Sequence, residues 1–581
     1  MGEQWLAGGP AADGSGLIVA DLGDVRVGPG SRARSATEGS ATVTVVGDCP
    51  VGETELHRVL VAVRAGRWED LTGWPGSYWV MAANERERFI CGDLAGLRPV
   101  YYTADGTWAT HLRLLKKRLV PDLALAAARV VAGSDHWPGR SPYEGINLVP
   151  GGHGLLLRVG QAPQLVDVTA IQPAEDLQSG AAQFGAALTQ AVQYRVRAAG
   201  AMVGADLSGG LDSSAAVVLA SQVGQVHAVT YTDPYTSAED ASFAARIAEH
   251  TDIEHTIAHG TDDDLPFSFP TGQPTGLEPA LGAALFEMDR TYLAPVASLP
   301  LHLTGHGGDV VLDATSSVWV RLLQDGKRRA AHRQIVAYAR MRNVAPGPFW
   351  NGLKDTAALG RTGVLEKAVE QLEKNRPQHA PGVGGWSWCR LGTAASWLTP
   401  DGRAQVATLL RQAAADTSPP ERADEFDQWA ALRFTGASAR GWTPYADALG
   451  IRPVYPYLDN TVVRAAFAVP SEARRGLYTF KPLLSASLPD LPGWLLGRRS
   501  KGSFTPQRVM AFQQHRTQLG ELLAVSPLVT SGLFDHDAVA DTLAQLGQGR
   551  TPIGSADMHQ LLTVSWWLTG AGTCSSMGAS C

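Results

Sequence analysis

Several features that are missing from this 581-residue sequence exclude whole classes of protein. Its five cysteines are an odd number and have no CxxC spacing, which argues against a disulfide framework and a zinc site. It contains no run of roughly 18 apolar residues, so we expect no membrane span. Acidic residues outnumber basic ones by 56 to 49, and the net charge of −7 disfavours a nucleic-acid partner. No basic segment followed by an apolar one opens the sequence, so we expect no secretory signal and a cytoplasmic protein.

Two common phosphate-binding motifs do not fit. The sequence contains no GxxxxGK[ST], and its one Gly-Lys pair, Gly326–Lys327, is followed by arginine. The loop SGGLDSS at residues 208–214 lacks the GxGxxG spacing of a dinucleotide-binding fold. Neither a kinase-type γ-phosphate loop nor a dinucleotide site is therefore supported.

The sequence divides into two blocks. Short strand-like runs separated by turn residues dominate residues 1–170, among them ATVTVVG, SYWVMAA and PVYYT, and this pattern predicts layered sheets. A linker at 171–179 leads to residues 180–570, where strands alternate with helices before the pattern becomes mostly helical. We therefore predict an α/β fold with a parallel sheet and a helical extension. Residues 571–581 are small and polar, and we expect a disordered tail.

The loop DLSGGLDSS at residues 206–214 lies between a predicted strand, AMVGADL, and a predicted helix, SSAAVVLASQ. A further strand, VHAVTYT, completes a parallel βαβ unit. A glycine-rich turn from a strand into a helix binds anions, because its backbone N–H groups and the helix N-terminus attract negative charge. An ordinary strand-to-helix turn is the alternative. The phosphate-binding candidates in this loop are Leu207, Ser208, Gly209, Gly210, Asp212, Ser213 and Ser214.

An acid inside an anion-binding loop is unfavourable unless a cation lies beside it. Asp212 therefore suggests Mg²⁺ held by carboxylates and phosphate oxygens. A second acid, Asp309, follows the strand LPLHLT in the loop TGHGGD, and ligands bind where parallel strands end. The alternative for Asp309 is a helix N-cap. Lys481 in TFKPLL and Lys501 in RRSKGSF are candidates to neutralise a pyrophosphate, although RRSKGSF also fits a solvated basic turn.

Taken together, these motifs resemble the asparagine synthetase-like branch of the N-type ATP pyrophosphatases. SGGLDSS matches the family's pyrophosphate loop, TGHGGD its second loop and RRSKGSF its catalytic-lysine loop, while PVYPYLDNTVVRAAFAVP looks like its helical landmark. DLTGWPGSYWVMAANERERFICGDLAGLRPVYYT is similar to the family's glutaminase-domain core. The resemblance implies an N-terminal glutaminase-like (Ntn-type) sandwich at 1–170, an adenylating ATP-pyrophosphatase domain at 180–570, and the cofactors ATP and Mg²⁺. Besides the loop residues, we expect Thr230, Gly305, Lys481 and Lys501 in the ATP site, and Asp212 and Asp309 on the metal.

Within this superfamily the sequence looks closest to the lasso-peptide macrocyclases, through HLTGHGGDVVL, the pair YTFKPLL and RRSKGSF, and SPLVTSGLFDHDAV. The resemblance implies that an Asp or Glu side chain of a ribosomally made peptide is adenylated by ATP. The N-terminal amine of the same peptide then forms an isopeptide bond, with release of AMP and pyrophosphate. The implied catalytic residues are Lys501, His306 and Lys481. The implied partners are a leaderless core peptide, a leader-binding protein and a leader peptidase.

The first block departs from the family pattern. A glutaminase of this type uses an N-terminal cysteine as its nucleophile, whereas the sequence begins Met1-Gly2-Glu3 and its first cysteine is Cys49. We therefore expect this block not to release ammonia from glutamine, so that the amine must arrive with the substrate.

Alternatives remain open for one residue and for the function. Beta-lactam synthetases carry a Tyr where His306 stands, paired with a Glu for which this sequence offers no clear match. His306 is accordingly a base, a residue that shapes the substrate pocket, or a packing residue. The second candidate function is a small-molecule amide-forming synthetase of the beta-lactam synthetase type. A non-catalytic scaffold is the third, and SGGLDSS, Asp309 and Lys501 together argue against it.

Overall fold

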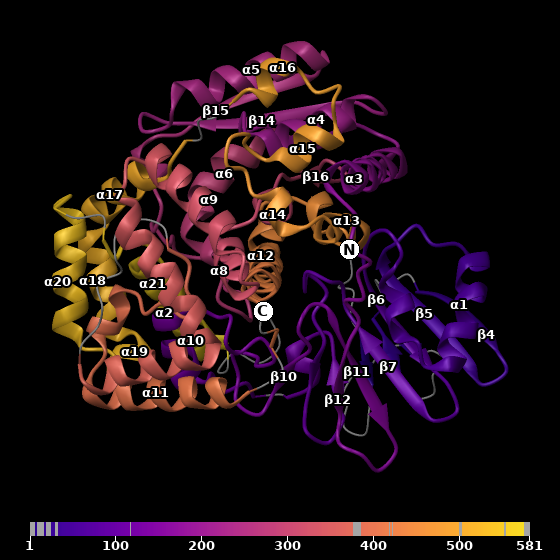
Figure 1. Cartoon of the computed structure of the whole chain (residues 1–581), viewed down its shortest axis with the longest axis horizontal. Coiled ribbons are helices and arrows are strands. Elements are labelled where there is room, and N and C mark those ends of the chain that lie inside the picture. Colours follow the sequence, from indigo (N-terminus) through magenta and orange to yellow (C-terminus); the bar gives the residue numbers. More distant parts are fainter. Residues whose placement is uncertain are drawn as a thin grey trace.

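The structure is a computed structural model. It describes residues 6–8, 17–18, 25–28, 33–116, 118–375, 385–416, 419–420, 422–498, 502–550 and 553–574. Figure 1 shows antiparallel sheets at the lower right, a parallel sheet at the top and a helical lobe at the lower left. No helix in the described part of the chain has the length and apolarity needed to cross a membrane.

The first block contains two six-stranded antiparallel sheets, as the strand-like runs predict. One has the order β10-β8-β9-β1-β3-β2 and the other β12-β11-β7-β6-β5-β4. Trp79 and Met81 of β6 pack with Leu6 and Trp108 of the first sheet, while Tyr78 and Val80 face the opposite way into a second core. The central strands of the second sheet are therefore buried on both faces. The bounds are β1 Leu6–Gly8, β2 Leu17–Ile18, β3 Arg26–Val27, β4 Ala33–Glu38, β5 Ala41–Asp48, β6 Ser77–Ala83, β7 Glu87–Cys91, β8 Tyr101–Tyr102, β9 Trp108–Ala109, β10 Asn147–Leu148, β11 His153–Arg158 and β12 Gln164–Asp167, with α1 at Glu53–Ala65.

The second block is built on a five-stranded parallel sheet with the order β15-β14-β13-β16-β17. The chain runs outward from β13 through β14 and β15, and then returns to the other side of β13 with β16. This reversal creates a topological switch point between β13 and β16, where ligands bind at the carboxyl ends of the strands. The predicted βαβ unit is confirmed. The elements are β13 Val203–Asp206, β14 Val226–Thr232, β15 Glu254–His259, β16 His302–Leu303 and β17 Pro453–Val454, with α3 Leu177–Ala199, α4 Leu211–Ser221, α5 Ala238–Thr251, α6 Phe286–Leu293, α7 Gly308–Leu312 and α13 Asn460–Ala468.

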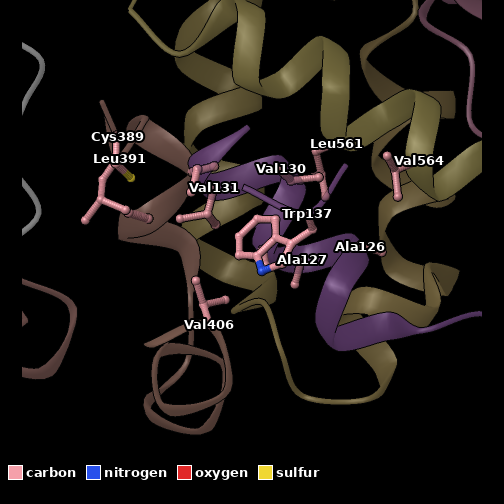
Figure 2. Close-up of a cluster of buried hydrophobic side chains, with 14 of the residues drawn as sticks. Ala126, Ala127, Val130, Val131, Trp137, Cys389, Leu391, Val406, Leu561 and Val564 are labelled. Carbon is pink, nitrogen blue, oxygen red and sulfur yellow. The ribbon is translucent and has the colours of Figure 1, made fainter. Parts of the chain in front are cut away.

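The remaining helices form a lobe beside this sheet, and one helix of the first block lies inside its core. α2 (Leu123–Ala132) buries Val130 and Val131 against Leu391, Val406 and Leu561 of the lobe (Figure 2). The sequence boundary near residue 170 therefore does not coincide with the boundary between cores. The lobe helices are α8 Ser317–Gln324, α9 Arg328–Met341, α10 Pro346–Glu373, α11 Pro400–Ala415, α12 Ala423–Ala448, α14 Ser471–Arg474, α17 Thr505–Gln514, α18 Arg516–Val525, α19 Pro527–Thr530, α20 His536–Gly547 and α21 Ser555–Cys574. Two short helices are exceptions, α15 Pro482–Ser487 and α16 Gly493–Leu496, because their leucines join the core of the parallel-sheet domain.

The expected disordered tail requires a correction at its start. Residues 571–574 continue α21, because the helix runs to Cys574. The rest of the tail, residues 575–581, lies outside the described residues.

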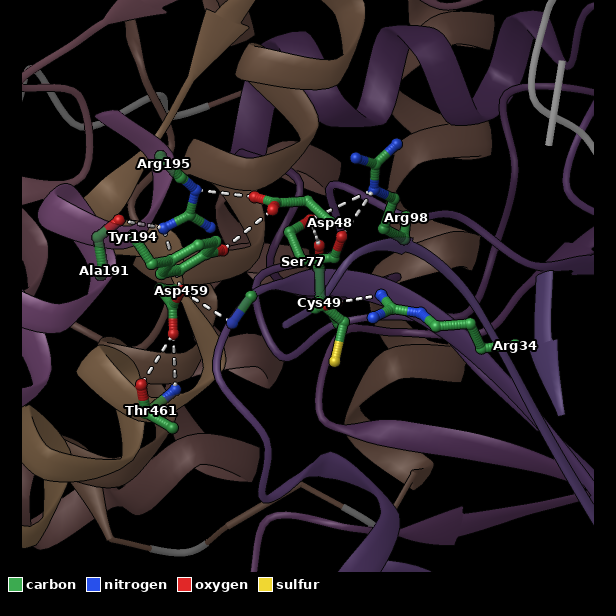
Figure 3. Close-up of polar contacts among 12 residues, drawn as sticks. Arg34, Asp48, Cys49, Ser77, Arg98, Ala191, Tyr194, Arg195, Asp459 and Thr461 are labelled. Atoms are coloured by element: carbon green, nitrogen blue, oxygen red, sulfur yellow. Dashed lines mark hydrogen bonds and ion pairs between the residues drawn. The ribbon is translucent and has the colours of Figure 1, made fainter. Parts of the chain in front are cut away.

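A buried ion-pair network ties the first block to the parallel-sheet domain (Figure 3). Arg195 of α3 binds Asp48 of β5 at 2.6 Å and Asp459 at 3.1 Å, and the hydroxyl of Tyr194 donates to Asp48. Asp459 also accepts the backbone N–H of Gly76 in the first block at 2.8 Å. Burial alone would lower the pKa of Arg195, but Asp48 and the other partners raise it overall, so the guanidinium stays charged. The two blocks are thus joined by satisfied charges as well as by packing.

Candidate active site

The SGG loop lies at the switch point, between the end of β13 and the start of α4. Gly209 has a φ of +73°, a left-handed conformation that favours glycine. Ser213 closes the loop, because its hydroxyl accepts from the backbone N–H of Ser208 at 3.2 Å and meets the Ser208 hydroxyl at 3.0 Å. Ser213 and Ser214 are buried, whereas Ser208 is exposed. Of the predicted hydroxyl donors, Ser208 is therefore the one that the structure presents at the surface.

The loop TGHGGD lies directly against the SGG loop. A Cβ on Gly308 would lie 2.5 Å from Cγ of Asp212, and a Cβ on Gly305 would lie 2.8 Å from the backbone N of Ser213. Only the missing side chains allow this approach. Gly305 therefore forms a contact surface between the two loops.

Lys481 joins the two predicted metal-binding carboxylates. Its Nζ lies 2.5 Å from Oδ2 of Asp212 and 2.7 Å from Oδ1 of Asp309. The Lys481 side chain is only 3% exposed, and burial lowers its pKa, but the two carboxylates outweigh burial and raise the pKa overall. The ammonium is therefore charged and held at the carboxyl edge of the sheet. The backbone of Lys481 is left-handed, with a φ of 52°, and Pro482 then starts α15.

The donor set fits a magnesium–nucleotide complex. Mg²⁺ is usually held by one or two carboxylates together with phosphate oxygens, and Asp212 and Asp309 converge on one point beside an anion-binding loop. No group of three or more His, Cys, Asp or Glu residues in the described ranges is arranged to bind a metal by itself.

Lys501 lies outside the described residues, but the start of its loop is anchored by a residue that the sequence analysis missed. Arg498 donates to the backbone carbonyl of Gly209 and to the carboxylate of Asp240, and its guanidinium lies 4.5 Å from the ring centroid of Phe243. This contact fixes the chain three residues before Lys501 against the SGG loop. The basic run RRS was the one sign of this residue in the sequence. The sequence could not show that its first arginine is buried, because that burial depends on contacts with distant segments.

Thr230 requires a correction. Its hydroxyl donates to the backbone carbonyl of Leu207 at 2.5 Å and meets Nε2 of His255 at 2.8 Å, and the residue is buried. Thr230 and Leu207 therefore support the loop from behind and do not present side chains to a ligand.

A second polar group that sequence reasoning missed surrounds Asp206. One oxygen of Asp206 accepts from the hydroxyl of Tyr292 at 2.5 Å and from Nε2 of His302 at 2.7 Å. His302 is 2% exposed and its Nδ1 has no hydrogen-bond partner among the described residues, so its contact with Asp206 is made through a proton on Nε2. Asp206 remains 26% exposed, immediately before the SGG loop. Its position at a strand end was the only signal in the sequence.

His306 lies next to this group. Its Nε2 donates to the backbone carbonyl of Thr435 on α12 at 3.3 Å, and its ring meets Tyr455 edge-on. The surrounding protein lowers the pKa of His306 by desolvation, more than the carboxylates of Asp206 and Asp309 raise it. A neutral ring with its proton on Nε2 leaves the lone pair on Nδ1. This geometry suits a base and equally suits a residue that shapes the pocket.

Three of the cysteines, Cys49, Cys91 and Cys389, are not prepared to act as nucleophiles. Cys49, Cys91 and Cys389 are all buried, and desolvation raises their pKa values, to about 12 for Cys49 and Cys389. A reactive cysteine instead needs a lowered pKa and access.

A parallel sheet with a glycine loop, two carboxylates and a charged lysine at its switch point defines a nucleotide-phosphate-binding α/β domain. Residues 183–569 match the asparagine synthase family, and the chain belongs to that family. Membership assigns it to the ATP-dependent amide-forming ligases, whose members use ATP with Mg²⁺.

Curated proteins and solved structures do not narrow this family assignment. No curated protein matches the chain. Among solved structures, glutamine phosphoribosylpyrophosphate (PRPP) amidotransferase from B. subtilis, complexed with ADP and GMP, is 12% identical, with a TM-score of 0.17 over 55% of this chain and 70% of that one. The allosteric regulatory enzyme of purine biosynthesis is 11% identical, with a TM-score of 0.15 over 46% of this chain and 54% of that one. These scores establish neither the fold nor the function.

Proposed function

We propose that the protein is an AMP-forming macrocyclase that makes lasso peptides. It adenylates an Asp or Glu side chain of a ribosomally made peptide and joins this side chain to the peptide's N-terminal amine. The observation that carries the proposal is the convergence of Asp212, Asp309 and Lys481 beside the SGG loop, in a chain of the amide-forming asparagine synthase family.

In the first step, the peptide carboxylate attacks the α-phosphorus of ATP, and the bond to pyrophosphate breaks. The N-terminus of α4 and Lys481 stabilise the charge that develops on the leaving pyrophosphate. Mg²⁺ held by Asp212 and Asp309 would neutralise the phosphate oxygens. Lys501, which follows Arg498 by three residues in the sequence, is the second cation proposed for this site.

In the second step, the peptide amine attacks the acyl carbon, the C–N bond forms and AMP leaves. An N-terminal amine has a pKa near 8, so a weak base suffices to remove its proton. His306, neutral and with its lone pair on Nδ1, is the proposed base. Because both reacting groups belong to one peptide, holding them together supplies a large effective molarity.

The source of the amine distinguishes this proposal from amidation by glutamine. The buried thiols of Cys49, Cys91 and Cys389 have raised pKa values and are not activated, which agrees with an amine that arrives on the substrate. The proposed partners are the leaderless core peptide and, upstream of it, a leader-binding protein and a leader peptidase, all in the cytoplasm.

The test combines mass spectrometry with nucleotide analysis. Purified protein, ATP, Mg²⁺ and a leaderless peptide should give a product lighter by one water, together with AMP and not ADP. Asp212→Asn should abolish both, whereas the matched control Asp537→Asn, at a side chain that is 96% exposed on α20, should abolish neither. AMP formation with small amino acids but with no peptide would instead favour the beta-lactam synthetase-type function. Product formation by Asp212→Asn would refute adenylation at this site.

A further inference from the structure

A cavity of about 180 Å³ lies between the first block and the helical lobe, apart from the Asp212 site. Its walls come from α2, the segment 134–151, residues 278–281, α12 and α21. It exceeds the roughly 150 Å³ of an engineered cavity that holds benzene. Trp137 and Val564, which line it, belong to the buried cluster of Figure 2. The cavity is therefore lined by core residues at the place where the two blocks meet.

One part of the lining is apolar and aromatic. Trp137, Trp567 and Phe434 line it together with Val149 and Pro150. Phe434 on α12 is 44% exposed, which is unusual for a large apolar side chain so close to a core. Such a surface suits an apolar or aromatic group of a ligand.

The other part of the lining carries an excess of positive charge. Two of its arginines are already neutralised, because Arg440 binds Glu278 at 2.6 Å and Arg140 binds Asp122 at 2.7 Å. Arg129 and Arg433 have no carboxylate within ion-pair distance among the described residues.

Arg129 and Arg433 are held in place by backbone carbonyls. Arg129 donates to the carbonyl of Arg140 at 2.6 Å, and its Nε is buried without a partner. Arg433 donates through Nε to the carbonyl of Gly151 at 2.9 Å. Burial lowers the pKa of each guanidinium to about 10, so both remain charged at neutral pH.

Asp135 is the one lining carboxylate that forms no ion pair in the described ranges. Its charge acts on Arg433, as does that of Asp167, while Glu278 and Asp122 act on Arg129. The lining itself carries four arginines, Arg129, Arg140, Arg433 and Arg440, against two carboxylates, Asp135 and Glu278. An anionic ligand would offset this excess of positive charge and accept charge-assisted hydrogen bonds from the guanidinium groups.

We propose that this cavity binds the C-terminal residue of the peptide substrate, with its carboxylate on Arg129 and Arg433 and its side chain among Trp137, Trp567 and Phe434. This inference rests on the proposed function. The C-terminal residue is the one position that carries a carboxylate and an adjacent side chain whatever the peptide sequence. It is also distant from the reacting N-terminus.

The position of α12 supports this assignment. The carbonyl of Thr435 accepts from His306, whereas Phe434, one residue earlier, lines the cavity. A peptide that crosses α12 can therefore engage the His306 side with its reacting end and the cavity with its tail.

The experiment compares one leaderless peptide as a free C-terminal acid and as a C-terminal amide. With the wild-type protein, amidation should lower kcat/KM about tenfold or more, mainly through KM, because it removes charge-assisted hydrogen bonds. Arg433→Gln should make the acid and the amide equivalent, and Arg433→Lys should restore part of the preference. The matched control Arg58→Gln alters an arginine of α1 that is 74% exposed and lies outside the cavity lining, and it should keep the full preference. Melting curves of all four proteins establish that they are folded.

A binding assay without ATP separates this inference from the proposed function. N-acetylphenylalanine and its amide are titrated onto the full chain, and tryptophan fluorescence is followed. Preference for the acid, lost in Arg433→Gln, would support the cavity even if no peptide is cyclised, and would then indicate a free carboxylate as its ligand. Equal handling of acid and amide by the wild-type protein in both assays would overturn the inference, as would an unchanged preference in Arg433→Gln.

Discussion

Replacing Lys481 by methionine tests whether the site is held together by charge. The substitution removes an ammonium that lies 2.5 Å from Asp212 and 2.7 Å from Asp309, at a side chain that is 3% exposed. Asp212 would then keep its charge but lose this ammonium, beside a second carboxylate. Removing one member of a buried pair costs about 3–5 kcal/mol. We expect the free energy of unfolding to fall by this amount in the absence of nucleotide.

A double-mutant cycle isolates the interaction from the loss of packing. Asp212→Asn alone leaves Lys481 with Asp309, whose side chain is 61% exposed and contributes less than about 1 kcal/mol. The double variant Asp212→Asn/Lys481→Met replaces the pair by neutral groups, which is often close to neutral for stability. The double variant should therefore be more stable than the sum of the single losses predicts, by about 2–3 kcal/mol.

Urea denaturation followed by tryptophan fluorescence measures the four stabilities, and Asp537→Asn serves as a surface control. All variants at Lys481 and Asp212 should also lose AMP formation. Single losses that add within about 0.5 kcal/mol would show that Lys481 and Asp212 are not coupled, and the assignment of this pair as the core of the site would fail.

Three further predictions concern other parts of the molecule. Desolvation raises the pKa of Asp289 to about 7 from 3.8, so the folded state binds more protons between these values and stability falls as the pH rises through this window. Asp289→Asn should therefore exceed the wild-type protein in stability by up to about 4 kcal/mol at pH 8, with no difference near pH 3.5, as measured by urea titration at both pH values. Gly308→Ala places a Cβ 2.5 Å from Asp212 and should abolish AMP formation. The control Gly352→Ala has open space around it in α10, so it should keep activity and raise the free energy of unfolding by up to about 1 kcal/mol. Equal activity of the two variants would contradict the close approach of the two loops. Iodoacetamide at pH 8 should label Cys49, Cys91 and Cys389 only after unfolding, as followed by peptide mass spectrometry, and rapid labelling of native protein would contradict their burial.

The parts of the site that the sequence predicted are those set by local structure. SGGLDSS and TGHGGD each encode a strand end, a glycine turn and a helix start within a few residues. Their meeting at one sheet edge follows from the rule for parallel sheets. Asp212, Asp309 and Lys481 could be named from the sequence for this reason, although the ammonium between the two carboxylates could not.

The parts that the sequence did not reveal depend on contacts between distant segments. Asp206 meets partners 86 and 96 residues away, and Arg498 meets a backbone carbonyl 289 residues away. No periodicity or motif reports such pairs. The packing of α2 into the lobe was missed for the same reason, because an apolar helix in a sequence does not indicate which core it enters.

The position of α2 also determines how the chain can be divided. A cut near residue 170 would take Val130 and Val131 out of the lobe and would strip Arg195 of Asp48. In the second piece, the apolar side chains that pack on Val130 and Val131 would be exposed, and the guanidinium of Arg195 would keep Asp459 as its remaining carboxylate partner. The ligase domain therefore needs the first block in order to fold, whether or not that block catalyses any reaction.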